Sequence, residues 1–338
     1  MIDITIKNVA KEAGVSTATV SRVINGVSGV RPSTIKKVND AIARINYVPN
    51  AVARNLKTEK TNTIGLLVSN ISNSHFTFMA KTIEQILRDE GYIVIFCSTD
   101  DRADMELKYL QRLMSLRVDG LILNTTGQND DYVAGLSNML PIVLVDRYIH
   151  NHKFFGDFVG SNNFDGMKTM TRHLVDLGHR KIGIITSNLL ASTGRERLRG
   201  FQAAMQNIGV CVDDNYPYRY DSSFFNIEGG MDGSKYLMSL EDKPTAIAVI
   251  NNDMAIGVYK YLYANHISVP EEVSIVSYGN IENSELFCIE PTYVTLNPHF
   301  IGEKAGQYLL SRINNRSLGN REVIYESTLY IHDSTKKL

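Results

Sequence analysis

The sequence is poor in cysteine and has no long hydrophobic run. Its 338 residues include three cysteines, and no two of them form a Cys-x-x-Cys pair: Cys97, Cys211 and Cys288. This spacing excludes a disulfide framework and a cysteine-based metal site, and it favours reduced thiols in a cytoplasmic protein. Nowhere do about 18 apolar residues run together, and residues 1–14 lack the apolar core of a signal peptide. Export and membrane insertion are therefore not expected.

The common catalytic motifs are absent as well. There is no P-loop, no His-Glu-x-x-His, no Gly-x-Ser-x-Gly and no dinucleotide-binding glycine fingerprint. The eight histidines are scattered, and His173 and His179 are interpreted as helix-end or packing residues. We expect no enzymatic activity, no metal ion and no cofactor. A sugar kinase or isomerase remains as an alternative without motif support.

The near-neutral net charge of −1 conceals an uneven distribution. Residues 1–60 contain ten Lys or Arg and four Asp or Glu, a net charge of +6, whereas the remaining 278 residues carry −7. A basic N-terminal part on an acidic body indicates that the N-terminal part binds an anionic partner.

From residue 63 onward, apolar runs alternate with amphipathic stretches. The runs predict buried strands at 64–68, 92–96, 121–123, 142–145, 181–185, 246–250 and 273–276. The stretches between them predict helices near 76–90, 102–117, 163–177, 193–208 and 252–265. Continuous apolar strands have both faces covered, so the pattern indicates a parallel α/β architecture. We expect two lobes divided in the loop-rich stretch 146–160; a single large barrel is the competing arrangement.

The first 26 residues predict a helix-turn-helix. Thr5 can cap a helix over 6–13 that ends at Gly14, and Ser16 can cap a second helix over 17–25 that Gly26 closes. Apolar residues fall where these helices would pack: Val9, Ala10, Val15, Val20 and Val23. A third helix begins at Pro32, and a break is expected before Pro49.

The outer face of the second helix would carry Thr17, Ala18, Ser21 and Arg22. Small and hydroxyl side chains allow close approach to a duplex, and an arginine can contact guanine through two hydrogen bonds in the major groove. The alternative is a short helical hairpin without a nucleic-acid partner, which the +6 charge makes less favourable.

Several segments of the sequence resemble a known protein family. The segments ITIKNVAKEAGVSTATVSRVING and YVPNAVARNLKTEKTNTIGLLVSNISNSHF resemble the lactose/galactose-repressor (LacI/GalR) family of bacterial transcription regulators, as do VDGLIL, PIVLVDR, HLVDLGHRKIGII, RLRGFQAAM and NDMAIG. The resemblance implies a small all-α helix-turn-helix headpiece (1–48), a hinge helix and linker (49–62), and a periplasmic-binding-protein-like core of two doubly wound parallel-sheet lobes (63–338). We expect an N-lobe of about 63–160 and 292–321, and a C-lobe of about 161–291 and 322–338.

The resemblance also implies DNA-contacting residues. In the headpiece these are Thr5, Ser16, Thr17, Ala18, Thr19, Ser21, Arg22 and Asn25, and in the hinge they are Asn50, Ala53, Leu56 and Lys57. Leu56 would wedge between base steps in the minor groove and kink the duplex. The alternative for Leu56 is a packing role between two paired hinges.

Effector-contacting residues are implied on the loops after the core strands: Asn73, Phe76, Thr125, Asp146, Arg147, Asn162, Arg195, Arg197, Asn252, Gly279 and Asn280. The family usually has Asp where this chain has Asn162, Asn252 and Gly279. Loss of carboxylates beside retained arginines predicts an anionic effector, such as a sugar acid or phosphosugar. A site that has lost effector binding is the alternative, as is regulation by a protein corepressor.

The resulting expectation is a homodimeric, effector-responsive repressor of a carbohydrate operon that binds a pseudo-palindromic DNA operator. Whether the effector is an inducer or a corepressor is left open. A catabolite-control-type regulator with a protein corepressor is one alternative. A cytosolic sugar-binding protein without a role at DNA is another.

Overall fold

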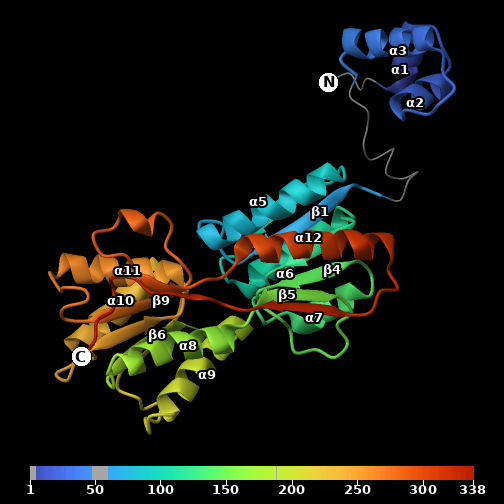
Figure 1. Ribbon diagram of the computed structural model, residues 1–338. Helices are drawn as coiled ribbons and strands as arrows, with labels where there is room; N and C mark the ends of the chain where they lie inside the picture. The colour runs from blue at the N-terminus through green and yellow to red at the C-terminus, as the bar shows by residue number, and fades with distance from the viewer. Residues whose placement is uncertain (1–4, 48–59, 188) are drawn as a thin grey trace. The chain divides into compact units, whose positions relative to one another are not determined.

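The computed structural model describes residues 5–47, 60–187 and 189–338. The chain divides into two compact units, Met1–Thr61 and Asn62–Leu338 (Figure 1). The predicted hinge residues Asn50, Ala53, Leu56 and Lys57 lie outside the described residues.

The first unit contains three helices: α1 (Ile6–Ala13), α2 (Thr17–Ile24) and α3 (Pro32–Arg44). Thr5 precedes α1, where its backbone N–H donates to Asn8 Oδ1 (2.9 Å), and Gly14 ends the helix at φ +66°. The side chain of Ser16 caps α2 by accepting a hydrogen bond from Thr19 N (3.1 Å). The predicted helix-turn-helix is therefore present, with α2 ending one residue before the predicted position.

Apolar side chains join the three helices. Val9, Ala10, Val20, Val38 and Ala41 are buried together, and Val15 and Val23 pack against them half-buried. Because these residues account for the apolar face of α2, its opposite face is left for contact with a partner.

The second unit consists of two lobes, each built on a six-stranded sheet. The N-lobe sheet is wholly parallel in the order β11-β5-β4-β3-β1-β2. Its strands are β1 (Thr63–Val68), β2 (Ile93–Ser98), β3 (Gly120–Leu123), β4 (Ile142–Val145), β5 (Asp157–Ser161) and β11 (Arg321–Tyr325). Helices α5 (Ser74–Asp89) and α12 (Pro298–Asn314) contribute to one apolar cluster, and α6 (Ala103–Ser115) and α7 (Asp130–Ser137) contribute to another.

The C-lobe sheet has the order β12-β10-β9-β8-β6-β7. Its strands are β6 (Ile182–Ser187), β7 (Arg219–Ser222), β8 (Ala246–Val249), β9 (Ser274–Tyr278), β10 (Thr292–Val294) and β12 (Leu329–Tyr330), of which β12 is antiparallel to β10. The helices are α8 (Asn163–Asp176), α9 (Ser192–Gln206), α10 (Ile227–Ser239) and α11 (Asn252–Ala264), and Ser284–Leu286 form a 3₁₀ turn. The predicted two-lobed parallel α/β architecture is confirmed.

Each predicted core strand and helix is present within two residues at either end. The predicted lobe limits, however, need correction. The stretch 146–160, expected to be a loop between the lobes, contains most of β5, which belongs to the N-lobe sheet. Residues 292–294 pair with β9 in the C-lobe, and 321–325 pair with β5 in the N-lobe. The error arose because β10 and β11 are short and carry polar residues, so they lack the continuous apolar signal of a central strand.

None of the described helices is long and apolar enough to cross a lipid bilayer.

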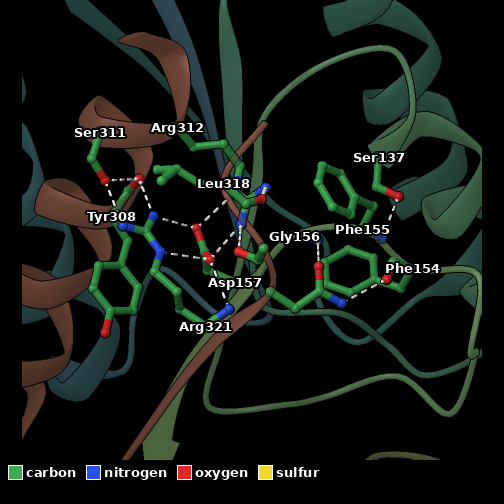
Figure 2. A network of polar contacts seen from close by, with 12 residues as sticks. Ser137, Phe154, Phe155, Gly156, Asp157, Tyr308, Ser311, Arg312, Leu318 and Arg321 are labelled. Atoms are coloured by element: carbon green, nitrogen blue, oxygen red, sulfur yellow. Dashed lines mark hydrogen bonds and ion pairs between the residues drawn. The ribbon is translucent and has the colours of Figure 1, made fainter. Parts of the chain in front are cut away.

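A buried ion cluster holds the edge of the N-lobe sheet (Figure 2). Asp157 at the start of β5 is 0% exposed and accepts hydrogen bonds from Arg312 on α12 (2.7 and 2.9 Å) and from Arg321 on β11 (2.7 and 3.0 Å). Burial by itself raises the pKa of Asp157, but the two guanidiniums outweigh it and lower the pKa below the usual value. The backbone carbonyls of Leu318 and Gly319 accept further hydrogen bonds from Arg312. The cluster thus ties the start of β5 to α12 and β11, whose arginines follow Asp157 by 155 and 164 residues.

Replacing Asp157 with Asn should destabilise the core by about 3–5 kcal/mol, because it leaves two guanidiniums without their buried counter-charge. Urea denaturation of the full chain measures the change. Asp104→Asn is the matched control: it removes one partner of the exposed Arg102–Asp104 pair, and it should leave the free energy of unfolding almost unchanged because solvent screens this pair. Equal effects of the two substitutions would contradict the role of the cluster.

A second buried polar contact anchors the C-terminal segment. His179 is fully buried; its Nδ1 lies 2.8 Å from Thr245 Oγ1, and its Nε2 lies 3.1 Å from the carbonyl oxygen of Lys336. The Lys336 carbonyl can only accept, so Nε2 donates and Nδ1 accepts from the Thr245 hydroxyl. Burial lowers the pKa of His179 below its ordinary value of 6.5.

Folding should therefore weaken as the pH falls through the range below 6.5, because the unfolded chain then takes up a proton that buried His179 refuses. His179→Gln should flatten this part of the pH profile of unfolding free energy. His152, which is exposed, provides the control, and His152→Gln should leave the profile unchanged. A wild-type profile that is flat between pH 8 and 5 would contradict the prediction.

Candidate functional site

The exposed face of α2 carries the residues predicted to contact DNA. Thr17, Ala18 and Arg22 are exposed, and Thr19 and Ser21 are half-buried beside them. The predicted residues of α2 thus lie at or near this surface, including Ser16 and Asn25, which are exposed at the two ends of α2. Thr5 is exposed at the start of α1.

Arg22 is held in place by the loop that follows α2. Its Nη2 donates to the carbonyl oxygen of Ser28 (3.1 Å), and Asn25 Nδ2 donates to Ser21 Oγ (3.3 Å). One edge of the Arg22 guanidinium is thereby fixed to the backbone. Such a fixed arginine loses less conformational freedom when it binds a base edge.

The second candidate site is a cavity between the two lobes, where the carboxyl ends of their strands meet, as expected for open α/β sheets. Its volume is about 50 Å³. The N-lobe contributes Ser69, Asn70, Asn73, His75, Phe76, Asp101, Asn124, Asp146 and Arg147, and the rest of the core contributes Thr193, Arg197, Phe225, Asn251, Asn252, Asp253 and Leu296. We refer to it as the cleft cavity.

Six of the predicted effector residues lie in this lining: Asn73, Phe76, Asp146, Arg147, Arg197 and Asn252. Five others lie outside it. Arg195 donates to the carbonyls of Leu189 and Leu190, so it supports a loop. Asn162 caps α8 by accepting from Asp165 N (3.1 Å).

Three further predicted effector residues also lie outside the lining: Thr125, Gly279 and Asn280. Thr125 Oγ1 accepts from Gly127 N (3.1 Å), and Asn280 is half-buried beyond the cavity. Gly279 adopts φ +95°, and a Cβ atom there would lie 2.8 Å from Leu296 Cδ1. An aspartate at position 279 would therefore require both an unfavourable backbone conformation and movement of Leu296.

Both guanidiniums of the cavity already have partners. Arg197 donates to Asn163 Oδ1 (2.8 Å) and to the carbonyl oxygen of Ile250 (2.7 Å), and its guanidinium lies 4.0 Å from the centre of the Tyr278 ring. Burial lowers the pKa of Arg197 from its ordinary value.

Arg147 forms an ion pair with Asp101 (2.5 Å) and donates to the carbonyl oxygen of Thr125 (3.2 Å). Its guanidinium also lies 5.5 Å from the centre of the Phe225 ring in the C-lobe. The two arginines therefore shape the walls of the cavity as well as supplying charge.

Carboxylates outnumber arginines in the lining, with Asp101, Asp146 and Asp253 against Arg147 and Arg197. Asp146 contacts His75 Nε2 at 2.6 Å, and both side chains are buried. Burial raises the pKa of Asp253, whose Oδ2 lies 3.5 Å from Asn70 Nδ2. The resemblance implied that the cavity lacks carboxylates at three positions where the family usually has Asp. Asp101, Asp146 and Asp253 nevertheless place carboxylates in the lining.

The two lobes touch directly through an amide pair. Asn73 Nδ2 donates to Asn252 Oδ1 (2.9 Å), and Asn252 Nδ2 donates back to Asn73 Oδ1 (3.3 Å), with both side chains buried. Asn73 precedes α5 in the N-lobe and Asn252 begins α11 in the C-lobe.

Sequence reasoning missed Asp101, Phe225 and Leu296 as lining residues, whereas His75 and Asp253 lie on loops that it placed at the cleft. Asp101 follows the predicted strand over 92–96, so its place in the chain could have identified it. Phe225 follows β7, a four-residue strand with the sequence RYDS that carries no apolar run. Among the described residues, no group of three or more His, Cys, Asp or Glu could hold a metal ion.

Comparison with known proteins identifies the family. The family model described as "Bacterial regulatory proteins, lacI family" matches residues 5–50, and that of the "Periplasmic binding protein-like domain" matches residues 171–335. The HTH-type transcriptional repressor PurR of Photobacterium profundum is 33% identical over 336 residues, or 99% of each chain. The chain belongs to the LacI family. The ribose operon repressor of Haemophilus influenzae is also 33% identical, over 334 residues and 99% of each chain.

Solved structures agree with the LacI-family fold. A LacI-family regulator from Enterococcus faecium with bound ribose has a TM-score of 0.72 at 25% identity, covering 82% of this chain and 99% of that one. The lac repressor dimer bound to operator shares the fold with a TM-score of 0.80 at 24% identity, covering 98% and 99%. The chain is thus a ligand-responsive, DNA-binding transcriptional repressor of the LacI type, and its relatives are not enzymes.

For this LacI-family headpiece, Arg22→Ala should weaken operator binding by about 1–3 kcal/mol and relax the base preference at one position of each half-site. Fluorescence anisotropy with an operator selected from a random library, and with its single-base variants, measures both effects. Arg44→Ala is the charge-matched control, because Arg44 lies on α3 and pairs with Glu12. An unchanged base preference in Arg22→Ala would remove Arg22 from base readout.

Proposed function

We propose that the protein binds a pseudo-palindromic operator as a homodimer through α2 and the hinge segment, and that a small, neutral, polyhydroxylated effector in the cleft cavity controls this binding. The observation that carries the effector class is the pairing of both cavity arginines with groups of the protein itself. Arg147 is paired with Asp101, and Arg197 with Asn163 and the Ile250 carbonyl.

This pairing argues against the anionic effector that the sequence suggested. An anion gains most from a guanidinium whose donors are free to form two parallel hydrogen bonds. Here Arg147 already donates through Nη1 and Arg197 through Nε and Nη1, so part of each positive charge is compensated within the protein. An anion would also face the carboxylates of Asp101, Asp146 and Asp253. A neutral ligand with hydroxyl groups meets no such repulsion, because each hydroxyl can donate to a carboxylate and accept from an amide.

The other lining groups suit the same ligand class. Phe76 and Phe225 supply apolar ring surface, and Asn73, Asn124 and Asn252 supply amide donors and acceptors. A few polar groups converging among aromatic walls are typical of small-molecule sites. The ribose-bound relative from Enterococcus faecium and the ribose operon repressors support a neutral sugar in this chain.

Control of DNA binding would follow from the two-lobed design. The lobes contact each other through the Asn73–Asn252 pair and through Tyr148 N, which donates to Ser192 Oγ (3.1 Å). An effector that binds one arrangement of the lobes more tightly shifts the population toward it. If the two arrangements also differ in operator affinity, effector and operator binding become coupled in both directions.

Titration calorimetry of the full chain tests the effector class. Among neutral pentoses and hexoses and their phosphorylated or carboxylate counterparts, with D-ribose and D-ribose 5-phosphate as the reference pair, we expect the best neutral sugar to bind at least about tenfold more tightly than its anionic form, a difference of about 1.4 kcal/mol. The same sugar should change operator affinity in an anisotropy assay, and sedimentation should show a dimer.

Each other outcome selects a different function. Tighter binding of the anionic form would restore the sugar acid or phosphosugar. Intact operator binding with no response to any sugar would favour a protein corepressor. Sugar binding by a chain that retards no duplex would indicate a sugar-binding protein without a regulatory role at DNA.

A further inference from the structure

Two segments meet across the lobes outside the lining of the cleft cavity. The N-lobe contributes residues 125–129, between β3 and α7, and the C-lobe contributes residues 189–192 at the start of α9. We refer to them as the N-lobe loop and the C-lobe turn. The sequence predicts Thr125 and Arg195 as effector contacts, yet neither residue lines the cavity. Both residues instead take part in holding these two segments.

A buried carboxylate holds the N-lobe loop. Glu106 on α6 is 0% exposed and accepts hydrogen bonds from Thr126 N (3.3 Å), from the Thr126 hydroxyl and from Asn129 Nδ2 (3.0 Å). The Thr125 hydroxyl in turn accepts from Gly127 N (3.1 Å). A buried charge needs such donors to replace its hydration, so moving the loop would leave the carboxylate of Glu106 unsatisfied. The N-lobe loop is therefore fixed in position.

The C-lobe turn is held from both lobes. Within the C-lobe, Arg195 Nη1 donates to the carbonyl oxygens of Leu189 (3.0 Å) and Leu190 (2.5 Å). From the N-lobe, Tyr148 N donates to Ser192 Oγ (3.1 Å), and Ser192 is buried. The turn is thus fixed at the point where the N-lobe reaches it.

Gly127 lies directly against the C-lobe turn. It has φ +77°, and a Cβ atom at this position would lie 3.6 Å from Ala191 Cα, 3.1 Å from the carbonyl carbon of Leu190 and closer still to the carbonyl oxygen of Leu190. These are backbone atoms of a turn that Arg195 holds, so they cannot rotate aside as the end of a flexible side chain would. A side chain at position 127 would instead push the two lobes apart.

We propose that Gly127 and Leu190 form a stop that sets how far the two lobes can close. The closed arrangement, in which Tyr148 N reaches Ser192 Oγ, requires residue 127 to lack a side chain. A side chain there would shift the population toward a more open arrangement of the lobes. The stop belongs to the folded core and needs no effector, whereas its consequence for operator binding rests on the proposed function.

Hydrogen exchange of the full chain without ligand tests the stop. The Tyr148 amide is the reporter, because its acceptor lies in the other lobe. Gly127→Ala should speed exchange at Tyr148 about fivefold or more, since each opening of the lobes breaks this hydrogen bond.

Gly91→Ala and Gly209→Ala are the matched controls. Their φ angles are +80° and +78°, and a Cβ atom at either position meets nothing within 4 Å. Both substitutions impose a similar backbone strain without the contact, so they should change exchange at Tyr148 less than about twofold. An equal rise in all three variants, or no rise in Gly127→Ala, would overturn the stop.

A second substitution tests the contact itself. Arg195→Met removes the donor that holds the Leu189 and Leu190 carbonyls, so the C-lobe turn can move. On this background Gly127→Ala should raise exchange at Tyr148 less than it does alone, a coupling that backbone strain at position 127 would not produce. An undiminished rise would contradict the contact. If Gly127→Ala alone does not fold, recovery of a folded chain in the double variant supports the stop, and failure of both overturns it.

Operator anisotropy and sugar calorimetry with the same variants separate the stop from the proposed function. We expect Gly127→Ala to change the affinity for operator, for sugar or for both, and Gly91→Ala to change neither. Faster exchange at Tyr148 with both affinities unchanged would support the stop and reject control of DNA binding by the lobe arrangement. Unchanged exchange would reject the stop and leave the proposed function to its own calorimetric test.

Discussion

In the two-lobed unit, the structure depends on the hydrogen bonds of buried polar groups at the junction where the two separately packed lobes meet. Both sheets end at this junction, and the loops that follow their strands carry amides, carboxylates and guanidiniums. A buried polar group without a partner costs about 1–3 kcal/mol, so each lobe completes the hydrogen bonding of the other. The Asn73–Asn252 pair is the direct example, since each amide both donates and accepts. A ligand that enters must replace these bonds with others of similar strength.

This requirement also explains the charge of the cleft. Counting side chains by sequence position suggested a basic pocket, because Asn162, Asn252 and Gly279 stand where the family usually has acids. In the folded chain, Asn162 caps a helix and Gly279 lies outside the cavity. Asp101, which lies in none of the family segments, enters the lining together with Asp146 and Asp253. The positive charges of Arg147 and Arg197 are then balanced by nearby carboxylates, and this charge balance changes which class of effector we expect the site to bind.

Much of the fold was predictable from sequence because its determinants are local. Helix caps at Thr5 and Ser16, the glycine at position 14 and the continuous apolar runs of the central strands act within a few residues. The lobe limits depend on β10 and β11, short strands whose pairing is set by the sheet rather than by their own pattern. In the same way, Arg195 and Arg197 differ by two positions on one helix, yet one supports a loop and the other faces the cleft. Only the packed structure separates them.

Gly279 has a consequence for how this cleft could change over evolutionary time. Its left-handed backbone disfavours any residue with a side chain, and a Cβ atom there would lie 2.8 Å from Leu296 Cδ1. A single substitution to aspartate would therefore require both a strained backbone and movement of the Leu296 side chain. The route to an acid at this position thus passes through a less stable protein.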